Sequence, residues 1–89
     1  MAFMQVDYTD GRSENVLVTL RATCKAEEHG LANDWGSVNE SSIRYSAYSV
    51  YAAMRMAGKT LPPFEQWMDT VSALSAAAPP EATEENPTE

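Results

Sequence analysis

The stretch AFMQVDYTDGRSENVLVTL, residues 2 to 20, decides whether this protein is purely helical or contains a sheet. Its first part alternates, with Met4, Val6 and Tyr8 on the more apolar side, as half-buried strands do. The Asp-Gly pair that follows is a strong hairpin signal, because glycine accepts the positive φ of tight hairpin turns. The segment ENVLVTL, rich in β-branched residues, is typical of the return strand. We therefore predict a β-hairpin over residues 3 to 19, which must pack on helices or on another chain because an isolated hairpin is only marginally stable.

Three helices are expected after the hairpin. The segment LRATCKAEEHG predicts a short helix with Thr19 as its N-cap and Gly30 as the residue that ends it. The clearest helix is ESSIRYSAYSVYAAMRMAG, which Asn39 or Ser41 can cap. The last, over about residues 63 to 75, begins after a proline pair and repeats its apolar residues every three or four positions. The predicted fold class is α+β and mainly α-helical: an N-terminal β-hairpin followed by three helices.

The composition of the chain changes after residue 78. The segment PPEATEENPTE contains three prolines, four glutamates and no large apolar residue. Such a segment cannot bury enough surface to offset its chain entropy. We predict one small domain over residues 1 to 78 and a disordered acidic tail over residues 79 to 89.

Charge and cysteine content narrow the classes of function. The chain has 13 acids and 6 bases, a formal net charge of -7, and its bases are scattered, which argues against nucleic acid as a partner. No apolar run approaches the roughly 18 residues of a membrane span. One cysteine cannot form an internal disulfide, and the start of the chain lacks the features of a signal peptide. A cytoplasmic protein with no membrane partner is expected.

The inventory of catalytic residues is small. His29 and Cys24 are the only histidine and cysteine, and a separation of five positions points them in different directions on a helix. Glu27, Glu28 and His29 are adjacent and splay around the helix, so no metal site is predicted there. No phosphate-binding glycine loop or nucleophile elbow is present. We expect no catalytic residues, no metal, no cofactor and no enzymatic activity.

The apolar side chains divide into a predicted core and a predicted surface. The core set shares helical spacing and consists of Ile43, Val50, Phe64, Val71 and Leu74. Five methionines and four tyrosines are more than so short a chain is expected to bury, and Met- and Tyr-rich patches suit adaptable protein binding. The predicted partner-binding set consists of Tyr48, Tyr51, Met54, Trp67 and Met68.

Several segments together carry a resemblance to a known family. The start VDYTDGRSENVLVTL, a short acidic helix, IRYSAYSVYAAMRMAGK and FEQWMDTV resemble the tail assembly chaperones of long, non-contractile-tailed bacteriophages, over residues 5 to 75. The middle helix of these proteins often ends in an ALRRAG-like segment. Their final helix often has the pattern Phe-Glu-x-Phe/Trp-x-Asp, which Phe64, Glu65, Trp67 and Asp69 match.

The resemblance implies a role in assembly. These chaperones bind the long, largely helical tape measure protein and keep it soluble until tail tube subunits polymerise around it. A longer form made by ribosomal frameshifting is typically present as well, and the resemblance implies that its extension contacts the tube subunits. The implied partners are the tape measure protein and tail tube subunits, the implied location is the host cytoplasm, and the protein is absent from the mature virion. A homo-oligomer is compatible with the sequence.

Two other functions stay open. The protein could be a small acidic phage inhibitor or adaptor that blocks a host nucleic-acid-binding protein, in which case the acids of the folded body should cluster on one face. It could also be a minor structural part of the virion, such as a head–tail connector, in which case purified particles should contain it.

Overall fold

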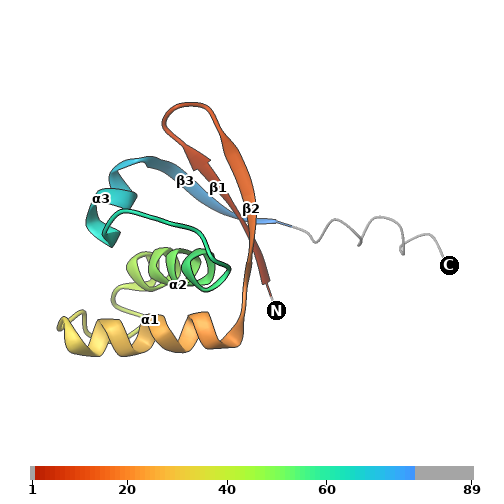
Figure 1. Cartoon of the computed structure of the whole chain (residues 1–89). Helices are drawn as coiled ribbons and strands as arrows, with labels where there is room; N and C mark the ends of the chain where they lie inside the picture. The colour runs from red at the N-terminus through yellow and green to blue at the C-terminus, as the bar shows by residue number, and fades with distance from the viewer. Residues whose placement is uncertain (1, 78–89) are drawn as a thin grey trace, which may run out of the picture.

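The computed structural model of the protein describes residues 2 to 77. Its elements in chain order are β1 (Ala2–Tyr8), β2 (Ser13–Val18), α1 (Leu20–Ala32), α2 (Ser42–Met56), α3 (Phe64–Asp69) and β3 (Val71–Ala77). The protein is thus a mixed α+β fold with a three-stranded antiparallel sheet and three helices (Figure 1). The acidic tail predicted over residues 79 to 89 lies outside the described residues.

The β-hairpin predicted at the start of the chain is present. β1 and β2 pair antiparallel, with Met4 opposite Val16 and Ala2 opposite Val18. At the turn, Gly11 has a φ of +94°, and the Arg12 amide donates to an Asp10 carboxylate oxygen at 3.0 Å. The alternation in the sequence correctly predicts which face of β1 packs against the helices, since Val6 and Tyr8 are buried there.

The predicted helix over residues 63 to 75 is wrong beyond Asp69. α3 ends where the Thr70 amide donates to the Trp67 carbonyl at 2.9 Å, and the chain continues as strand β3 along the free side of β1. The sheet order is β2-β1-β3. Pairing with β1 satisfies backbone groups that a helix at this position would leave at an open sheet edge. This gain outweighs the helix propensity of the alanines in the segment.

A β-bulge explains why β3 imitates a helix in its sequence. Leu74 lies opposite Val6 and Val71 lies opposite Tyr8, so the bulge inserts one extra residue of β3 between these two pairs. Residues three apart therefore share the inner face of the sheet, which is the spacing that also suits a helix. Val71 and Leu74 therefore do share one face, as the apolar stripe predicted, but they share the face of a bulged strand and not of a helix.

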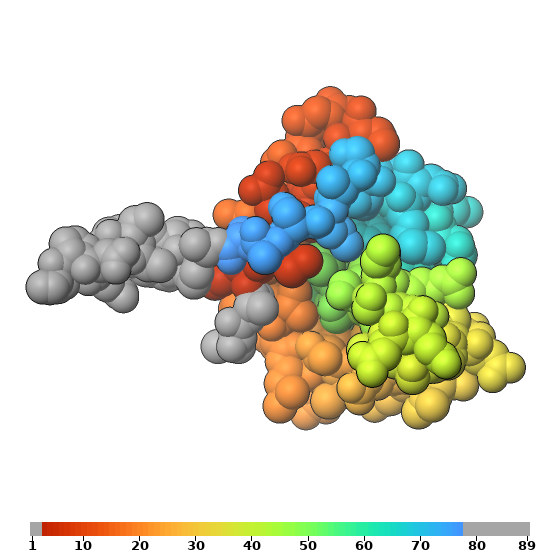
Figure 2. Space-filling view, turned by 180° about the vertical axis from the view of Figure 1, so that it is seen from behind, coloured from red at the N-terminus to blue at the C-terminus, as the bar shows by residue number. Residues whose placement is uncertain are grey.

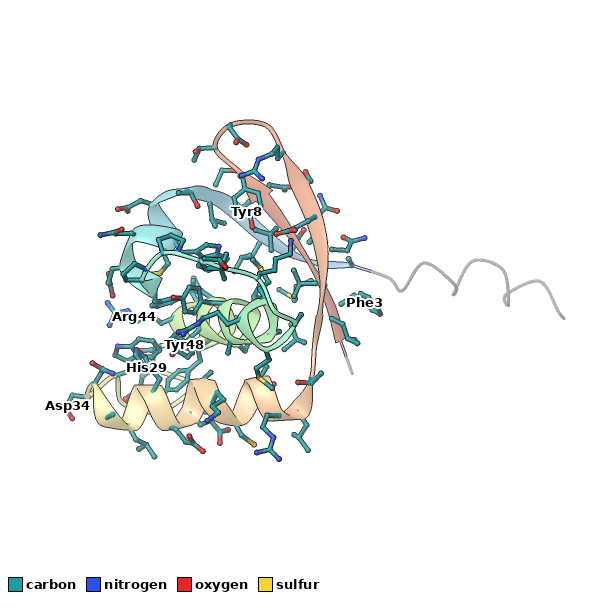
Figure 3. All side chains as sticks on the ribbon, in the orientation of Figure 1. Phe3, Tyr8, His29, Asp34, Arg44 and Tyr48 are labelled. Atoms are coloured by element: carbon teal, nitrogen blue, oxygen red, sulfur yellow. The ribbon has the colours of Figure 1, made fainter. Side chains whose placement is uncertain are left out.

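The three helices lie on one face of the sheet (Figure 1). α2 packs against α1 on one side and against β2 and α3 on the other, so most of its length is buried. The largest fully buried side chains are Trp67, Val6 and Val50. None of the helices within residues 2 to 77 covers the opposite face of the sheet, and Phe3 projects from this face away from the helices (Figure 3). Within residues 2 to 77, no helix is long and apolar enough to cross a membrane.

α1 is longer than predicted. The Thr19 hydroxyl caps its start by accepting from the Ala22 amide at 3.2 Å, as the sequence suggested. Gly30 does not end the helix, which continues to Ala32, and the Asn33 amide closes it on the carbonyls of the last turn. Gly30 is instead buried against the ring of Tyr45. The absence of a side chain at this position lets α2 approach α1 closely.

Candidate functional site

An apolar groove of about 430 Å³ lies between β3, α3 and the first turns of α2. The apolar side chains that line it include Met4, Ile43, Ala47, Met68, Val71 and Leu74. Serines of α2 and β3 provide the polar part of its lining. Figure 2 faces this side of the molecule, with β3 in blue and the start of α2 in yellow-green beside it. We call this feature the β3 groove.

Ile43 lies at the rim of the β3 groove and not in the core, so its prediction as a core residue is wrong. Its exposed fraction is 82%. Along the same stripe of α2, Ala47, Val50 and Met54 are buried. Ile43 belongs to the first turn of the helix, one turn before the stripe reaches the sheet and α3. The predicted helical spacing of the stripe was therefore correct, but the sheet and α3 do not cover the stripe as far as Ile43.

The two residues of α3 predicted to bind a partner have different environments. Trp67 is only 2% exposed, and its ring centroid lies 5.4 Å from that of Tyr51 and 6.1 Å from that of Phe64. Its indole nitrogen has no hydrogen-bond partner among the described residues. Met68 is half-buried and lines the groove. Met68 is therefore accessible to a partner, whereas Trp67 forms part of the wall that supports it.

Tyr51 and Met54, also predicted to bind a partner, are core residues of α2. Their exposed fractions are 3% and 2%, and the Tyr51 hydroxyl donates to the Pro62 carbonyl at 2.6 Å. Among the residues predicted for the core, Val50 and Phe64 are buried there. Val71 and Leu74 are half-buried and pack against this core from β3.

Tyr48 is accessible, but on a different side of α2. It lines a hollow between α1 and α2 together with Lys25 and Arg55. Its ring stacks on His29, with centroids 4.0 Å apart and 12° between the planes (Figure 3). The five residues of the predicted surface therefore do not form one patch. Met68 lies in the β3 groove, Tyr48 lies in the other hollow, and the remaining three are buried.

Cys24 and His29, the potential nucleophile and base of α1, have different surroundings. Cys24 is exposed on α1, whereas the His29 ring lies in an aromatic cluster with Tyr48 and Trp35. No hydrogen bond joins the two side chains in the described part of the chain. Within residues 2 to 77, no group of three or more His, Cys, Asp or Glu side chains is arranged to hold a metal ion.

An ion pair between Glu14 and Lys59 connects the hairpin to the segment after α2. The Tyr8 hydroxyl donates to one carboxylate oxygen of Glu14 at 2.6 Å, and Lys59 Nζ donates to the other at 2.6 Å. Burial, followed by the hydrogen bond to Glu14, raises the pKa of Tyr8 to about 12. The pKa of Glu14 is lowered overall. Partial burial acts to raise it, but the hydrogen bonds from Lys59 and Tyr8 outweigh burial. The cluster of Tyr8, Glu14 and Lys59 joins the hairpin to the segment after α2, and it lines no part of the β3 groove.

Sequence reasoning missed the groove because it missed β3. One signal was available: residues 70 to 80 carry no charge, although the rest of the chain is rich in acids. Such a run is unusual for an exposed segment and marks a strand or an interface.

Comparison of the chain with protein-family models, with curated proteins and with solved structures finds no match. The chemistry of the site must therefore be argued from its own residues. The β3 groove offers methionine, isoleucine, leucine and valine side chains with serines among them, so its surface is mainly apolar and adaptable in shape.

Proposed function

We propose that this protein is a non-enzymatic chaperone that binds an apolar segment of a client protein in the β3 groove. The observation that carries the proposal is the exposure of Ile43 and the partial exposure of Met68 at this groove, which leave apolar surface open to solvent. A chaperone without ATP needs such a pliable apolar surface. It also needs enough net charge to keep the coated client in solution, and the formal charge of -7 supplies it.

Within this proposal, the resemblance to phage tail assembly chaperones supplies the client. The client is a tape measure protein, held soluble in the host cytoplasm until tail tube subunits polymerise around it. Of the residues first expected to face the client, Met68 keeps this role. Ile43 joins it, whereas Trp67 lines the groove from the core and Tyr51 and Met54 are buried in the core without lining the groove.

The distribution of acids favours a chaperone over an acidic inhibitor. Of the nine acids outside the final segment, some lie on the hairpin, some on α1, some on the α1–α2 connection and some on α3. Two of them, Asp10 and Glu14, are engaged in ion pairs with Arg12 and Lys59. An inhibitor that presents carboxylates to a nucleic-acid-binding protein needs them gathered on one face.

Co-expression tests the proposal. The proposed client, a tape measure protein of a long, non-contractile-tailed phage, is expressed with the wild-type protein, with Ile43→Lys, with Leu31→Lys, or alone, and its soluble fraction is measured. We expect wild type to raise the soluble fraction severalfold and Ile43→Lys to lose most of this gain, because a charge at the rim of an apolar groove must be desolvated on binding.

Leu31→Lys is the matched control. Leu31 is 79% exposed on α1 and lines no part of the groove, so its substitution introduces the same charge at similar exposure. A client that is no more soluble with the wild-type protein than without it contradicts the proposal. Mass spectrometry of purified virions separates it from a connector role, since a chaperone is absent from particles and a connector is present.

A further inference from the structure

Among residues 2 to 77, β3 is an edge strand with one side unpaired. It bonds to β1 on one side only, and the sheet ends with it. In an antiparallel ladder, alternate residues direct their N–H and C=O groups away from the neighbouring strand. Within residues 2 to 77, no backbone partner outside the β1 ladder is present for Val71–Ala77. A row of donors and acceptors is therefore available along this edge.

The two edges of the sheet are treated differently. At the β2 edge, Glu14 is tied to Lys59 by an ion pair of 2.6 Å, and α2 packs against the strand. β3 contains only valine, serine, alanine and leucine, without a lysine, a proline or any charge. Sheets of soluble proteins normally protect an edge with such residues, apart from edges that are used for pairing. Within residues 2 to 77, the one protective device at this edge is the bulge at the start of β3.

The open edge lies beside the β3 groove. Val71, Leu74 and Met68 line the groove from the strand and from α3, and Ile43 faces them from α2. A strand added to β3 would direct every second side chain toward the helix layer and hence into this groove. Main-chain bonds at the edge and side-chain sites in the groove are the two components of peptide recognition by strand addition.

We propose that β3 captures an extended segment of the client as a fourth strand, with alternate apolar side chains of that segment in the β3 groove. This inference rests on the proposed chaperone function and specifies how the same site binds. It differs from the capture of a preformed client helix, because a helix satisfies its own backbone bonds and has no use for the edge.

Charge distinguishes the client from a second copy of this chain. Glu65 and Asp69 of α3 flank the start of β3, and the sequence after β3 contains four glutamates. In an antiparallel pair of two copies, the end of each β3 would meet the acids at the start of the other, and like charges oppose this pairing. The edge is instead complementary to a segment with apolar residues at alternate positions and lysine or arginine at its ends.

Peptide binding to the full-length protein tests strand addition. The probe is a synthetic peptide with the length of β3, 7 residues, in which valine alternates with threonine between terminal lysines. Two matched peptides carry N-methyl groups, one on its valines and one on its threonines. In a strand these two sets of N–H groups point to opposite edges, so only one set can face β3.

We expect one N-methylated peptide to bind about tenfold more weakly than the parent, since two or three hydrogen bonds are lost, and the other to bind like the parent. Hydrogen exchange followed by NMR should show that the amides of residues 71 to 77 that do not face β1 become protected on binding of the parent peptide. Equal binding of both N-methylated peptides, or no new protection at β3, overturns strand addition. Protection without peptide that grows with protein concentration also overturns it, because a second copy then occupies the edge.

This test is independent of the co-expression test. If the client is kept soluble while both N-methylated peptides bind equally, the chaperone function stands and strand addition is wrong. If the peptide adds to β3 while the client stays insoluble, the edge is a strand-binding site but the proposed function is wrong.

Discussion

Gly30 shows how one residue sets the distance between two helices. The Tyr45 ring lies where a Cβ on Gly30 would be, and the Tyr45 hydroxyl is held in place by donating to the Gly36 carbonyl at 2.6 Å. The ring therefore cannot move aside without breaking a short hydrogen bond. We expect Gly30→Ala to lower the free energy of unfolding by about 1 to 3 kcal/mol, measured by chemical denaturation, because overpacking a fixed contact outweighs the helix propensity of alanine.

Leu31→Ala is the control for this prediction. Leu31 is the neighbouring residue in the same turn of α1 and is 79% exposed, so its substitution should change stability by no more than about 0.5 kcal/mol. An increase in stability with Gly30→Ala, as expected for a glycine in an ordinary helix interior, would show that α2 does not pack on Gly30.

At the scale of elements, α2 is covered over only part of its length. Ile43 and Val50 lie on one stripe, 82% and 0% exposed. We expect Val50→Ala to cost about 2 kcal/mol in the free energy of unfolding, since it opens a cavity in the core, and Ile43→Ala to cost about 0.5 kcal/mol or less. Urea denaturation of the two variants measures the difference. Equal losses would place Ile43 in the core and close the β3 groove.

The identity of β3 as a strand has its own test. Ser75 lies opposite Gln5 on the face of the sheet that none of the described helices covers. Threonine suits a strand better than serine, whereas it is no better in a helix. We expect Ser75→Thr to raise the free energy of unfolding by about 0.5 kcal/mol. A loss of stability, together with helical chemical shifts over residues 71 to 77, would restore the helix that the sequence pattern suggested.

Elements were predictable where local signals agree. The hairpin follows from alternation, a turn glycine and β-branched residues, and these determine it without reference to the rest of the chain. β3 was not predictable in the same way, because its bulge places Val71 and Leu74 three residues apart on one face. Its alanines also favour a helix. Only the presence of an unpaired edge on β1 decides between the two conformations.

At the scale of the whole molecule, Glu14 connects the hairpin to the segment after α2 through Tyr8 and Lys59. Its pKa in the folded protein is lowered from the ordinary value of 4.5, so the unfolded chain binds a proton more readily. The stabilisation is therefore present above about pH 4.5 and is lost as the pH falls through the folded-state pKa. Hydrogen bonds lower the pKa of Asp7, and contacts with Arg12 lower that of Asp10, so both act in the same direction.

We expect the midpoint of urea unfolding to fall as the pH is lowered from about 5 to about 3. Glu14→Gln should flatten this pH dependence, because the variant lacks the carboxylate that titrates. It should lower the free energy of unfolding at neutral pH by only about 1 kcal/mol, because solvent weakens the partly exposed ion pair. Lys59→Met should reproduce part of the effect. If the stability of Glu14→Gln depended on pH in the same way as that of wild type, the contacts of Glu14 with Tyr8 and Lys59 would not contribute to stability.

The sequence by itself determined the α+β class, the hairpin and its faces, the cap of α1 and the existence of α2 as a helix. Each depends on patterns within a few residues, where turn geometry and periodicity act directly. Tertiary structure alone decided that residues 71 to 77 form a strand, that Ile43 is exposed, and that Tyr51, Met54 and Trp67 are buried. The physical reason is that burial and strand pairing depend on which surfaces meet, and one apolar stripe fits either a helix or a bulged strand until β1 supplies the edge that pairs with it.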